Sequence, residues 1–402
     1  MKGNWQRHSL SDLVRQIDVG VSVNCEDRRA RDGELAVLKT SAAVGEWFDA
    51  SEHKAVPPAE RGRVAVQPKR DTILICRSNT PELVGRCVYI DRDWPNLYLP
   101  DTLWRLTGDL SVCSMRWLAY ALQSRDARRQ IAYLATGTSA NMKKLSQGRL
   151  AELTLALPPL PEQRKIAEIL STWDEALALL DRRIELAERR KKGLAQRLLT
   201  GRVRFPDVGW EPWRTVHLGD VLKERKQRGY YELPLLSVTA DEGIVYRDEL
   251  DRRDTSNADK SKYLRVREGD IAYNTMRMWQ GRFGVSDLEG IVSPAYTVCT
   301  PRPSVDVRFM GYLFELPEII HLFRRFSQGL VSDTWNLKYG DFARIRVRIP
   351  SLPEQRRIAE VLQTCDEELA LLRRKRELTA KQKKGLMQRL LTGRVRVTVT
   401  AP

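Results

Sequence analysis

The sequence contains no long apolar run. None of its 402 residues falls in a stretch approaching the roughly 18 consecutive apolar residues that a membrane span needs. The first eight residues, Met1 to His8, do not form the apolar segment of a signal peptide. We therefore expect a cytoplasmic protein without membrane contact.

Histidine and cysteine are scarce and widely scattered. The four histidines and six cysteines nowhere stand at the spacing of a zinc site or of a redox pair. Most cysteines have apolar neighbours, as in Ile75-Cys76 and Val298-Cys299, which favours reduced and buried thiols. The sequence therefore predicts no metal site.

Motifs for nucleotide binding and catalysis are also missing. No glycine-rich loop of the Walker type occurs, and no Gly-x-Gly-x-x-Gly opens a helix after a strand. The Asn-Pro-Pro-aromatic motif of amino-methyltransferases is absent too. Glu-x-Lys pairs, as in many nucleases, occur at 52–54 and 224–226, but a highly charged chain contains such pairs by chance. We predict no catalytic residue and no cofactor bound by this chain.

An internal repeat organises the chain instead. Residues 158–204 match residues 350–396 without a gap, and 33 of 47 positions are identical. Both copies contain Leu-Pro-Glu-Gln-Arg and close with Leu-Leu-Thr-Gly-Arg-Val-Arg. The segments before each copy are much less alike. We therefore divide the chain into head 1 (1–157), a conserved segment (158–205), head 2 (206–349) and a second conserved segment (350–402).

Each conserved segment is predicted to form one long helix. Pro161 and Pro353 suit the first helical turn, and Gly201 and Gly393 suit the position after the last. Between them, apolar residues recur at alternating spacings of four and three, which predicts a coiled-coil seam. A helix of about 39 residues would be about 58 Å long.

Two such seams in one chain most simply pack on each other. The helices could serve only as an internal spacer, but apolar residues off the seam favour a second role, since a two-helix pair would leave them exposed. We expect partner subunits to dock on apolar helix positions: Ile169, Leu179, Leu186, Leu199, Leu362 and Leu369.

The heads show an α+β pattern. Short β-type runs occur at 72–76 and 87–90 in head 1, and at 271–273 and 295–299 in head 2. A helical stretch follows in each head, at 115–135 and 309–326. Strands and helices do not alternate regularly, so a parallel βαβ sheet is not expected.

Polar and basic loops occupy equivalent places in the two heads, one after a central strand and one before the conserved segment. Arg, Asn and Gln can read base edges, while Ser, Thr and Lys can hold phosphates. Any single residue could belong to an ordinary surface loop, but the equivalent placement favours DNA contact. The candidates are Arg77, Ser78, Asn79, Thr80, Thr138, Ser139, Lys143, Lys144, Asn274, Thr275, Arg277, Trp279, Gln280 and Lys338.

The net charge of +16 points to a polyanionic partner, but its distribution qualifies that reading. The two conserved segments hold 23 basic and 13 acidic side chains, so they carry ten of the sixteen surplus charges. The heads are nearly balanced. Base reading would therefore depend on a few local side chains rather than on bulk charge.

These features resemble the specificity subunits (HsdS) of type I restriction-modification systems over nearly the whole chain. The resemblance rests on the helix starts at 159–164 and 351–356, the Leu-Leu-Thr-Gly ends, and the runs Tyr273–Gly281 and Ser293–Tyr296. It implies two target-recognition domains of mixed α/β structure, separated by two long antiparallel coiled-coil helices with pseudo-twofold symmetry. Each domain would read one half of a split sequence in double-stranded DNA.

The resemblance also implies partners and their cofactors. Two modification subunits would dock on the helices and carry S-adenosylmethionine. Restriction subunits, with ATP and Mg²⁺, would join that core. Two alternatives stay open at this point: a stand-alone methyltransferase or nuclease, and a coiled-coil scaffold whose heads bind protein.

Overall fold

The computed structural model describes residues 5–137, 141–208, 211–239, 243–250, 259–331 and 334–399. The chain forms two compact units. Unit 1 comprises Met1–Asp181 and Lys375–Pro402, and unit 2 comprises Arg182–Arg374. Both boundaries fall inside long helices, so each unit contains one head together with part of both helices. The four-part division from sequence thus separates heads from helices, whereas packing groups each head with the helix portions that cover its core.

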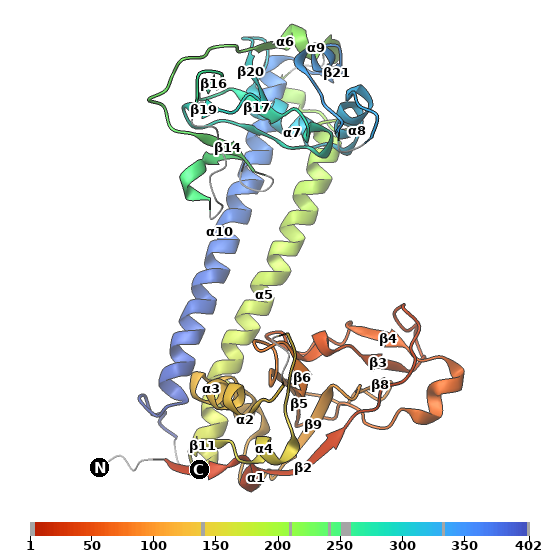
Figure 1. Ribbon diagram of the computed structural model, residues 1–402, viewed down its shortest axis with the longest axis vertical. Helices are drawn as coiled ribbons and strands as arrows, with labels where there is room; N and C mark the ends of the chain where they lie inside the picture. Colours follow the sequence, from red (N-terminus) through yellow and green to blue (C-terminus); the bar gives the residue numbers. More distant parts are fainter. Residues whose placement is uncertain are drawn as a thin grey trace. The chain divides into compact units, whose positions relative to one another are not determined.

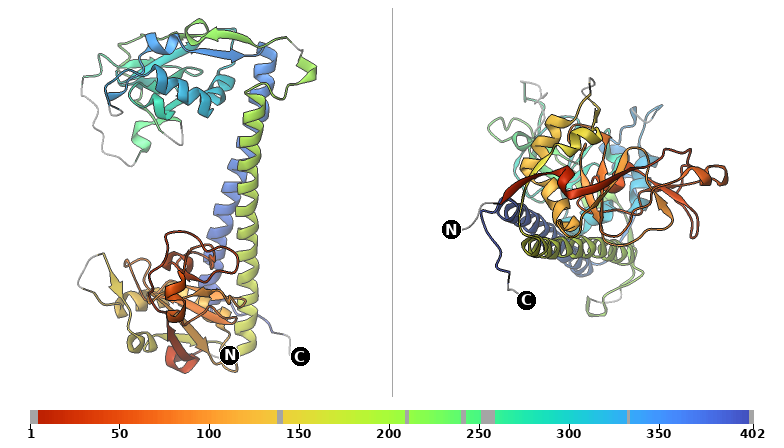
Figure 2. Two further views of the ribbon diagram at one scale, coloured as in Figure 1. Left: turned by 90° about the vertical axis from the view of Figure 1, so that its right-hand side faces the viewer. Right: turned by 90° about the horizontal axis from the view of Figure 1, so that it is seen from below.

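The two conserved segments form the predicted helices, α5 (Leu160–Leu198) and α10 (Leu352–Leu390), each 39 residues long. They run side by side in Figures 1 and 2. Apolar seam positions such as Ile166, Leu170, Ile358 and Leu362 are fully buried, which confirms the seam. Within the described residues, no helix is both long enough and apolar enough to cross a bilayer.

Ion pairs between the helices show that they are antiparallel. In unit 1, Asp174 pairs with Lys383 and Asp181 pairs with Arg376, the latter at 2.9 Å. As the residue number rises along α5, from Asp174 to Asp181, the number of its partner on α10 falls, from Lys383 to Arg376. In unit 2, Lys191 pairs with Asp366 at 2.6 Å and Arg373 with Glu188 at 2.6 Å, in the same sense. The polar end of each seam therefore lies against acidic residues of the other helix.

Head 1 is built on an antiparallel sheet of order β2-β9-β5-β7. A smaller sheet, β4-β3-β8, and the pairs β1-β11 and β10-β6 complete it. The strands are β1 Gln6–Ser9, β2 Val14–Val19, β3 Ala36–Leu38, β4 His53–Ala55, β5 Thr72–Cys76, β6 Ser78–Asn79, β7 Cys87–Ile90, β8 Leu97–Tyr98, β9 Leu103–Gly108, β10 Lys143–Lys144 and β11 Thr154–Leu157. The helices are α1 Leu10–Leu13, α2 Met115–Gln123, α3 Arg125–Leu134 and α4 Gln147–Ala151.

Head 2 repeats this plan with the sheet β13-β20-β17-β18 and the pairs β14-β15, β16-β19 and β12-β21. The strands are β12 Arg214–His217, β13 Leu222–Glu224, β14 Leu236–Val238, β15 Ile244–Tyr246, β16 Leu264–Val266, β17 Ile271–Asn274, β18 Phe283–Val285, β19 Gly290–Val292, β20 Tyr296–Pro301 and β21 Arg346–Ile349. The helices are α6 Leu218–Val221, α7 Val307–Phe314, α8 Pro317–Phe326 and α9 Tyr339–Ala343. The mixed helix and strand content confirms the α+β prediction.

The central strand of each head is buried on both faces. In β5, Ile73 and Ile75 join the core formed with α2 and the start of α5, while Leu74 and Cys76 join a second core against the small sheet. This two-residue alternation is the ordinary geometry of a strand. Burial on both faces holds β5 rigidly, so the loop that follows it starts from a fixed point.

The helical stretches predicted at 115–135 and 309–326 are each broken into two helices. Ser124 ends α2 and caps α3, where its hydroxyl accepts a hydrogen bond from the Ala127 amide at 3.3 Å. Pro317 stands in the first turn of α8 and keeps the preceding residue out of a helical conformation. Periodicity alone did not separate the paired helices, because both members of each pair contribute apolar residues to the same core.

Candidate nucleic-acid interface

The polar loop after β5 in head 1 lies against the loop that precedes the conserved segment. Strand β6 pairs antiparallel with β10, so that Ser78 is opposite Lys144 and Asn79 is opposite Lys143. The Leu145 amide also donates to the Arg77 carbonyl at 2.9 Å. The structure therefore brings together two segments that are more than sixty residues apart in sequence.

These segments line a hollow of about 470 Å³ in head 1. Its rim contains five of the candidates and two residues just before Lys143. Three further residues come from η1 (Thr40–Ala43) and from the turn before β9. The lining residues are Thr40, Arg77, Ser78, Asn79, Thr80, Asp101, Thr102, Asn141, Met142 and Lys144. No sequence pattern pointed to Thr40, Asp101 or Thr102, because only tertiary packing brings them to this place.

Side chains around the hollow differ in how far they are already engaged. Arg77 lies over the Trp104 ring at 5.6 Å, and its Nε is buried without a hydrogen-bond partner in the described structure. The Asn79 amide oxygen accepts from the Thr80 amide at 2.8 Å, and Lys143 donates to the Gly137 carbonyl at 2.9 Å. Lys144 is exposed. Arg77 and Lys144 are therefore the positive groups that the hollow offers to a ligand.

Head 2 holds its loops by the same backbone contact. The Leu337 amide donates to the Thr275 carbonyl at 2.8 Å, just as Leu145 does to Arg77. The Thr275 hydroxyl further donates to the Ala295 carbonyl at 2.9 Å. The loop after β17 is thus fixed both to the residue before β20 and to the loop before α9.

An aromatic cluster replaces the β6-β10 pair in head 2. The rings of Trp279 and Trp335 meet edge to face at 5.1 Å, and Arg324 of α8 lies over Trp335 at 5.1 Å. The Trp279 indole donates to the Met276 carbonyl at 3.1 Å. Of the candidates here, Trp279 is largely committed to holding the loop.

Arg277 and Gln280 remain the available groups of this loop. Both are exposed, and their side chains form no hydrogen bond or ion pair with the described residues. The amide oxygen of Asn274 accepts from the Met276 amide at 3.0 Å, so that residue partly shapes the turn. Gly281 closes the turn at φ 77°, a conformation that favours glycine. Lys338 is exposed, while Thr138 and Ser139 lie outside the described residues.

The predicted docking residues fall into two groups. Leu179 and Leu186 are 66% and 50% exposed, as a docking role requires. Leu199, Leu362 and Leu369 are buried in the chain itself, and Ile169 is half-buried against the head 1 core. Burial corrects the prediction for these three leucines: Leu199 and Leu362 belong to the core of unit 2, Leu369 is buried on α10, and none of them offers surface to a partner.

Two exposed leucines on α10 were missed. Leu371 and Leu378 are 72% and 44% exposed. They stand 192 residues after Leu179 and Leu186, which is the offset of the repeat. Each long helix therefore carries the same exposed pair, and the repeat itself was the signal that could have located the second pair.

Each head is tied to both long helices by a matching triad. In unit 1, the Tyr120 hydroxyl donates to Asp174 of α5, which also pairs with Lys383 of α10. In unit 2, the Tyr312 hydroxyl donates to Asp366 at 2.7 Å, and Lys191 pairs with the same carboxylate. Burial, followed by the carboxylate, raises the pKa of both tyrosines, which stay protonated donors. The heads are thus fixed to the helices, which preserves the orientation of their loops.

The described residues contain no group of three or more metal-ligating side chains, and all six cysteines are free thiols. Burial raises the pKa of Cys76, beside the head 1 hollow, so its thiol is not an activated nucleophile. The chemistry that this arrangement offers is hydrogen bonding and positive charge on exposed loops.

Comparisons with known proteins agree with this geometry. Residues 62–189 and 211–380 match the family described as "Type I restriction modification DNA specificity domain". Two proteins of Methanocaldococcus jannaschii named as type I restriction enzyme specificity subunits are similar. The MjaX protein is 26% identical over 351 residues, covering 81% of this chain and 78% of its own, and the MjaVIII protein is 25% identical over 323 residues, covering 74% of each.

The fold is also similar to a solved one. The crystal structure of the S subunit of a type I restriction-modification system from M. genitalium superposes with a TM-score of 0.61 at 16% identity, covering 97% of this chain and 96% of that one. Because the family match extends over most of both heads and most of both long helices, this chain belongs to the family of type I restriction-modification DNA specificity domains.

Proposed function

We propose that this chain reads a bipartite DNA target for a type I restriction-modification complex, with each head contacting one half-site. One observation carries the proposal. Both heads hold a polar loop after the central strand by an equivalent backbone hydrogen bond, Leu145 to Arg77 and Leu337 to Thr275, yet the loops present different side chains. A shared frame with different side chains suits two readers of different sequences.

The side chains set out what each head can read. Arg77 in head 1, and Arg277 and Gln280 in head 2, can form bidentate contacts with guanine or adenine edges in the major groove. Lys144 and Lys338 can contact phosphates, which position a protein on DNA without reading its sequence. The long helices set the gap between the half-sites in this proposal.

The exposed leucines support docking of two modification subunits. Each long helix carries an equivalent pair of exposed leucines: Leu179 and Leu186 on α5, and Leu371 and Leu378 on α10. Without a bound partner, these apolar side chains face water. Two equivalent sets suit two copies of one partner. In this proposal the chain is not an enzyme: S-adenosylmethionine sits on the modification subunits, and ATP and Mg²⁺ on the restriction subunits that join them.

Methylation sequencing tests the recognition role. The chain is expressed with its modification partner, and the methylated sites of the host genome are determined. We expect a split motif, and substitutions in the head 2 loop should change one half of it only. A motif that is continuous, or that changes in both halves, would contradict the assignment.

The enzyme alternative has its own test. The purified chain alone is incubated with DNA and either S-adenosylmethionine or Mg²⁺, and methyl transfer and strand cleavage are measured. We expect neither. Either activity in the absence of partner subunits would refute the non-catalytic role.

A further inference from the structure

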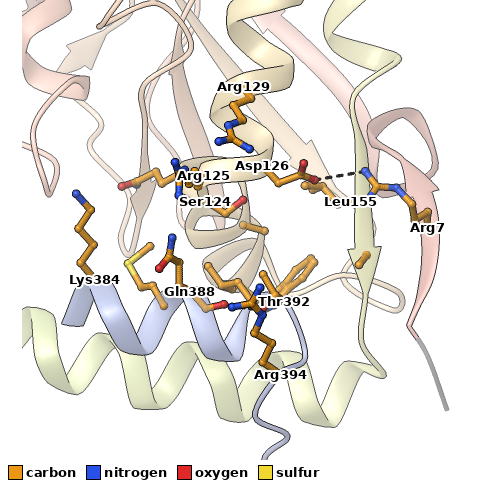
Figure 3. Close-up of a pocket in the computed structure, with 16 residues that line it drawn as sticks. Arg7, Ser124, Arg125, Asp126, Arg129, Leu155, Lys384, Gln388, Thr392 and Arg394 are labelled. Carbon is orange, nitrogen blue, oxygen red and sulfur yellow. Dashed lines mark hydrogen bonds and ion pairs between the residues drawn. The ribbon is translucent and has the colours of Figure 1, made fainter. Parts of the chain in front are cut away.

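A second hollow, of about 980 Å³, lies in unit 1 between head 1 and the end of α10. One wall comes from α3 and the end of α2, and carries Arg125, Asp126 and Arg129. The opposite wall comes from α10 and the residues after it, and carries Lys384, Gln388 and Arg394 (Figure 3). It shares no lining residue with the hollow at the DNA-reading loops of head 1. We call it the basic groove.

The basic groove has a marked excess of unpaired positive charge. Its one acid, Asp126, is already held by Arg7 at 3.4 Å and by the Gln130 amide at 3.2 Å. Four other cations form no ion pair or hydrogen bond with any residue in the described part of the chain: Arg125, Arg129, Lys384 and Arg394. Like charges around one hollow repel each other, so an acidic occupant would be favoured.

The groove also has an apolar floor. Its accessible apolar surface comes from Ala156 and Met387, which are partly exposed, whereas Trp117, Leu155 and Leu391 also line the groove but are almost fully buried. A DNA backbone offers phosphates but no apolar group to cover such a floor. An amphipathic acidic segment offers both kinds of group, as in helix-in-groove recognition.

Unit 2 does not repeat the groove, although the repeat supplies the same helix positions. Lys192, Gln196 and Arg202 of the first conserved segment correspond to Lys384, Gln388 and Arg394. There the Gln196 amide donates to Glu318 at 2.9 Å, which bridges the helix to α8. Pro317 and His321 replace the two free arginines of α3. Because Gln196 bonds Glu318 and two arginines are missing from α8, the described part of unit 2 has no equivalent of the basic groove.

We propose that the basic groove binds an acidic, amphipathic segment of a protein partner. Because the groove belongs to unit 1 and its counterpart in unit 2 is bridged, one such segment binds per chain. A partner that carries such a segment could therefore distinguish unit 1 from unit 2. This inference depends neither on the reading of DNA nor on the exposed leucines.

Fluorescence anisotropy on the full-length chain tests the proposal. The probe is a fluorescein-labelled synthetic helical peptide of Leu and Glu residues, with a Leu and Gln peptide and a random-sequence DNA duplex as comparisons. The test variant is Lys384→Gln with Arg394→Gln, and the matched control is Lys192→Gln with Arg202→Gln. All four residues are exposed, so both variants should fold, which thermal unfolding checks.

We expect the Leu and Glu peptide to bind about tenfold more weakly to the test variant, since two exposed charge contacts are lost. Its binding to the control variant should equal that of the parent. Equal weakening in the two variants, or equal binding of the Leu and Gln peptide, would overturn the proposal. Weaker binding of DNA with unchanged binding of the acidic peptide would also overturn it and assign the groove to phosphates.

Discussion

Breaking the buried ion pair between Arg204 and Glu354 should destabilise unit 2. The guanidinium approaches the carboxylate through Nε at 3.0 Å and Nη2 at 2.7 Å. The Glu354 side chain is 0% exposed and that of Arg204 is 14% exposed. The pair joins the residues that follow α5 to the first turn of α10. It therefore links the end of the first conserved segment to the start of the second.

Replacing Arg204 with Met leaves a buried carboxylate without its charge partner. Removing one member of a buried pair costs about 3–5 kcal/mol, because the remaining charge stays desolvated. Replacing both members with apolar residues of similar volume is often nearly neutral. We therefore expect Arg204→Met to lower the stability of unit 2 by about 3–5 kcal/mol, and Arg204→Met with Glu354→Leu to recover most of that loss.

Urea unfolding followed by hydrogen exchange measures this effect. Exchange is read on peptides from head 1 and head 2 separately, because a chain with two units need not unfold in one step. Arg202→Met is the matched control, since Arg202 is exposed and lies two residues away. Unchanged exchange in head 2 for Arg204→Met, or a double variant as unstable as the single one, would refute the reasoning.

Three further outcomes are expected. Arg277→Ala should relax one half of the methylated motif by about 1–3 kcal/mol of discrimination, and methylation sequencing with an unchanged motif would contradict this. Inserting seven residues into both long helices should lengthen the gap between half-sites and leave each half unchanged; the same sequencing would show an unaltered gap if the helices do not set it. Burial opposes ionisation of Glu162, but hydrogen bonds from Arg396 and Trp5 outweigh it and lower the carboxyl pKa below its ordinary 4.5. The Arg396 contact should therefore stabilise unit 1 above about pH 4.5 and lose that effect as the pH falls further, so urea titrations of Arg396→Met and the parent should converge in acid and differ at neutral pH.

The long helices were the most predictable part of the molecule. A heptad pattern that repeats about five times is a strong local signal for a coiled-coil helix, and proline and glycine mark the ends of that helix. Periodicity cannot say which apolar position packs inward when a third element covers the helix. Leu199 looked exposed on a two-helix pair, but it lies in the core of unit 2, where head 2 covers it.

The loops show a similar division. Sequence placed Arg77 and Arg277 on polar loops after central strands, because buried strands end in recognisable turns. It could not show that Thr40 and Thr102 share a hollow with Arg77, nor that Trp335 lies against Trp279. Those contacts join residues far apart in the chain, and they depend on strand order and register.

The amino-acid sequence by itself determined the repeat, the two long helices, the α+β heads and the polar loops, because each is encoded by local pattern or by direct identity between copies. Only the tertiary structure decided how the chain divides into units. Each head packs on portions of both helices, and contacts such as Glu162–Arg396 and Glu354–Arg204 join the start of one conserved segment to the end of the other. Tertiary structure also decided which charges stay unpaired, since the basic groove exists only where α3 faces the end of α10.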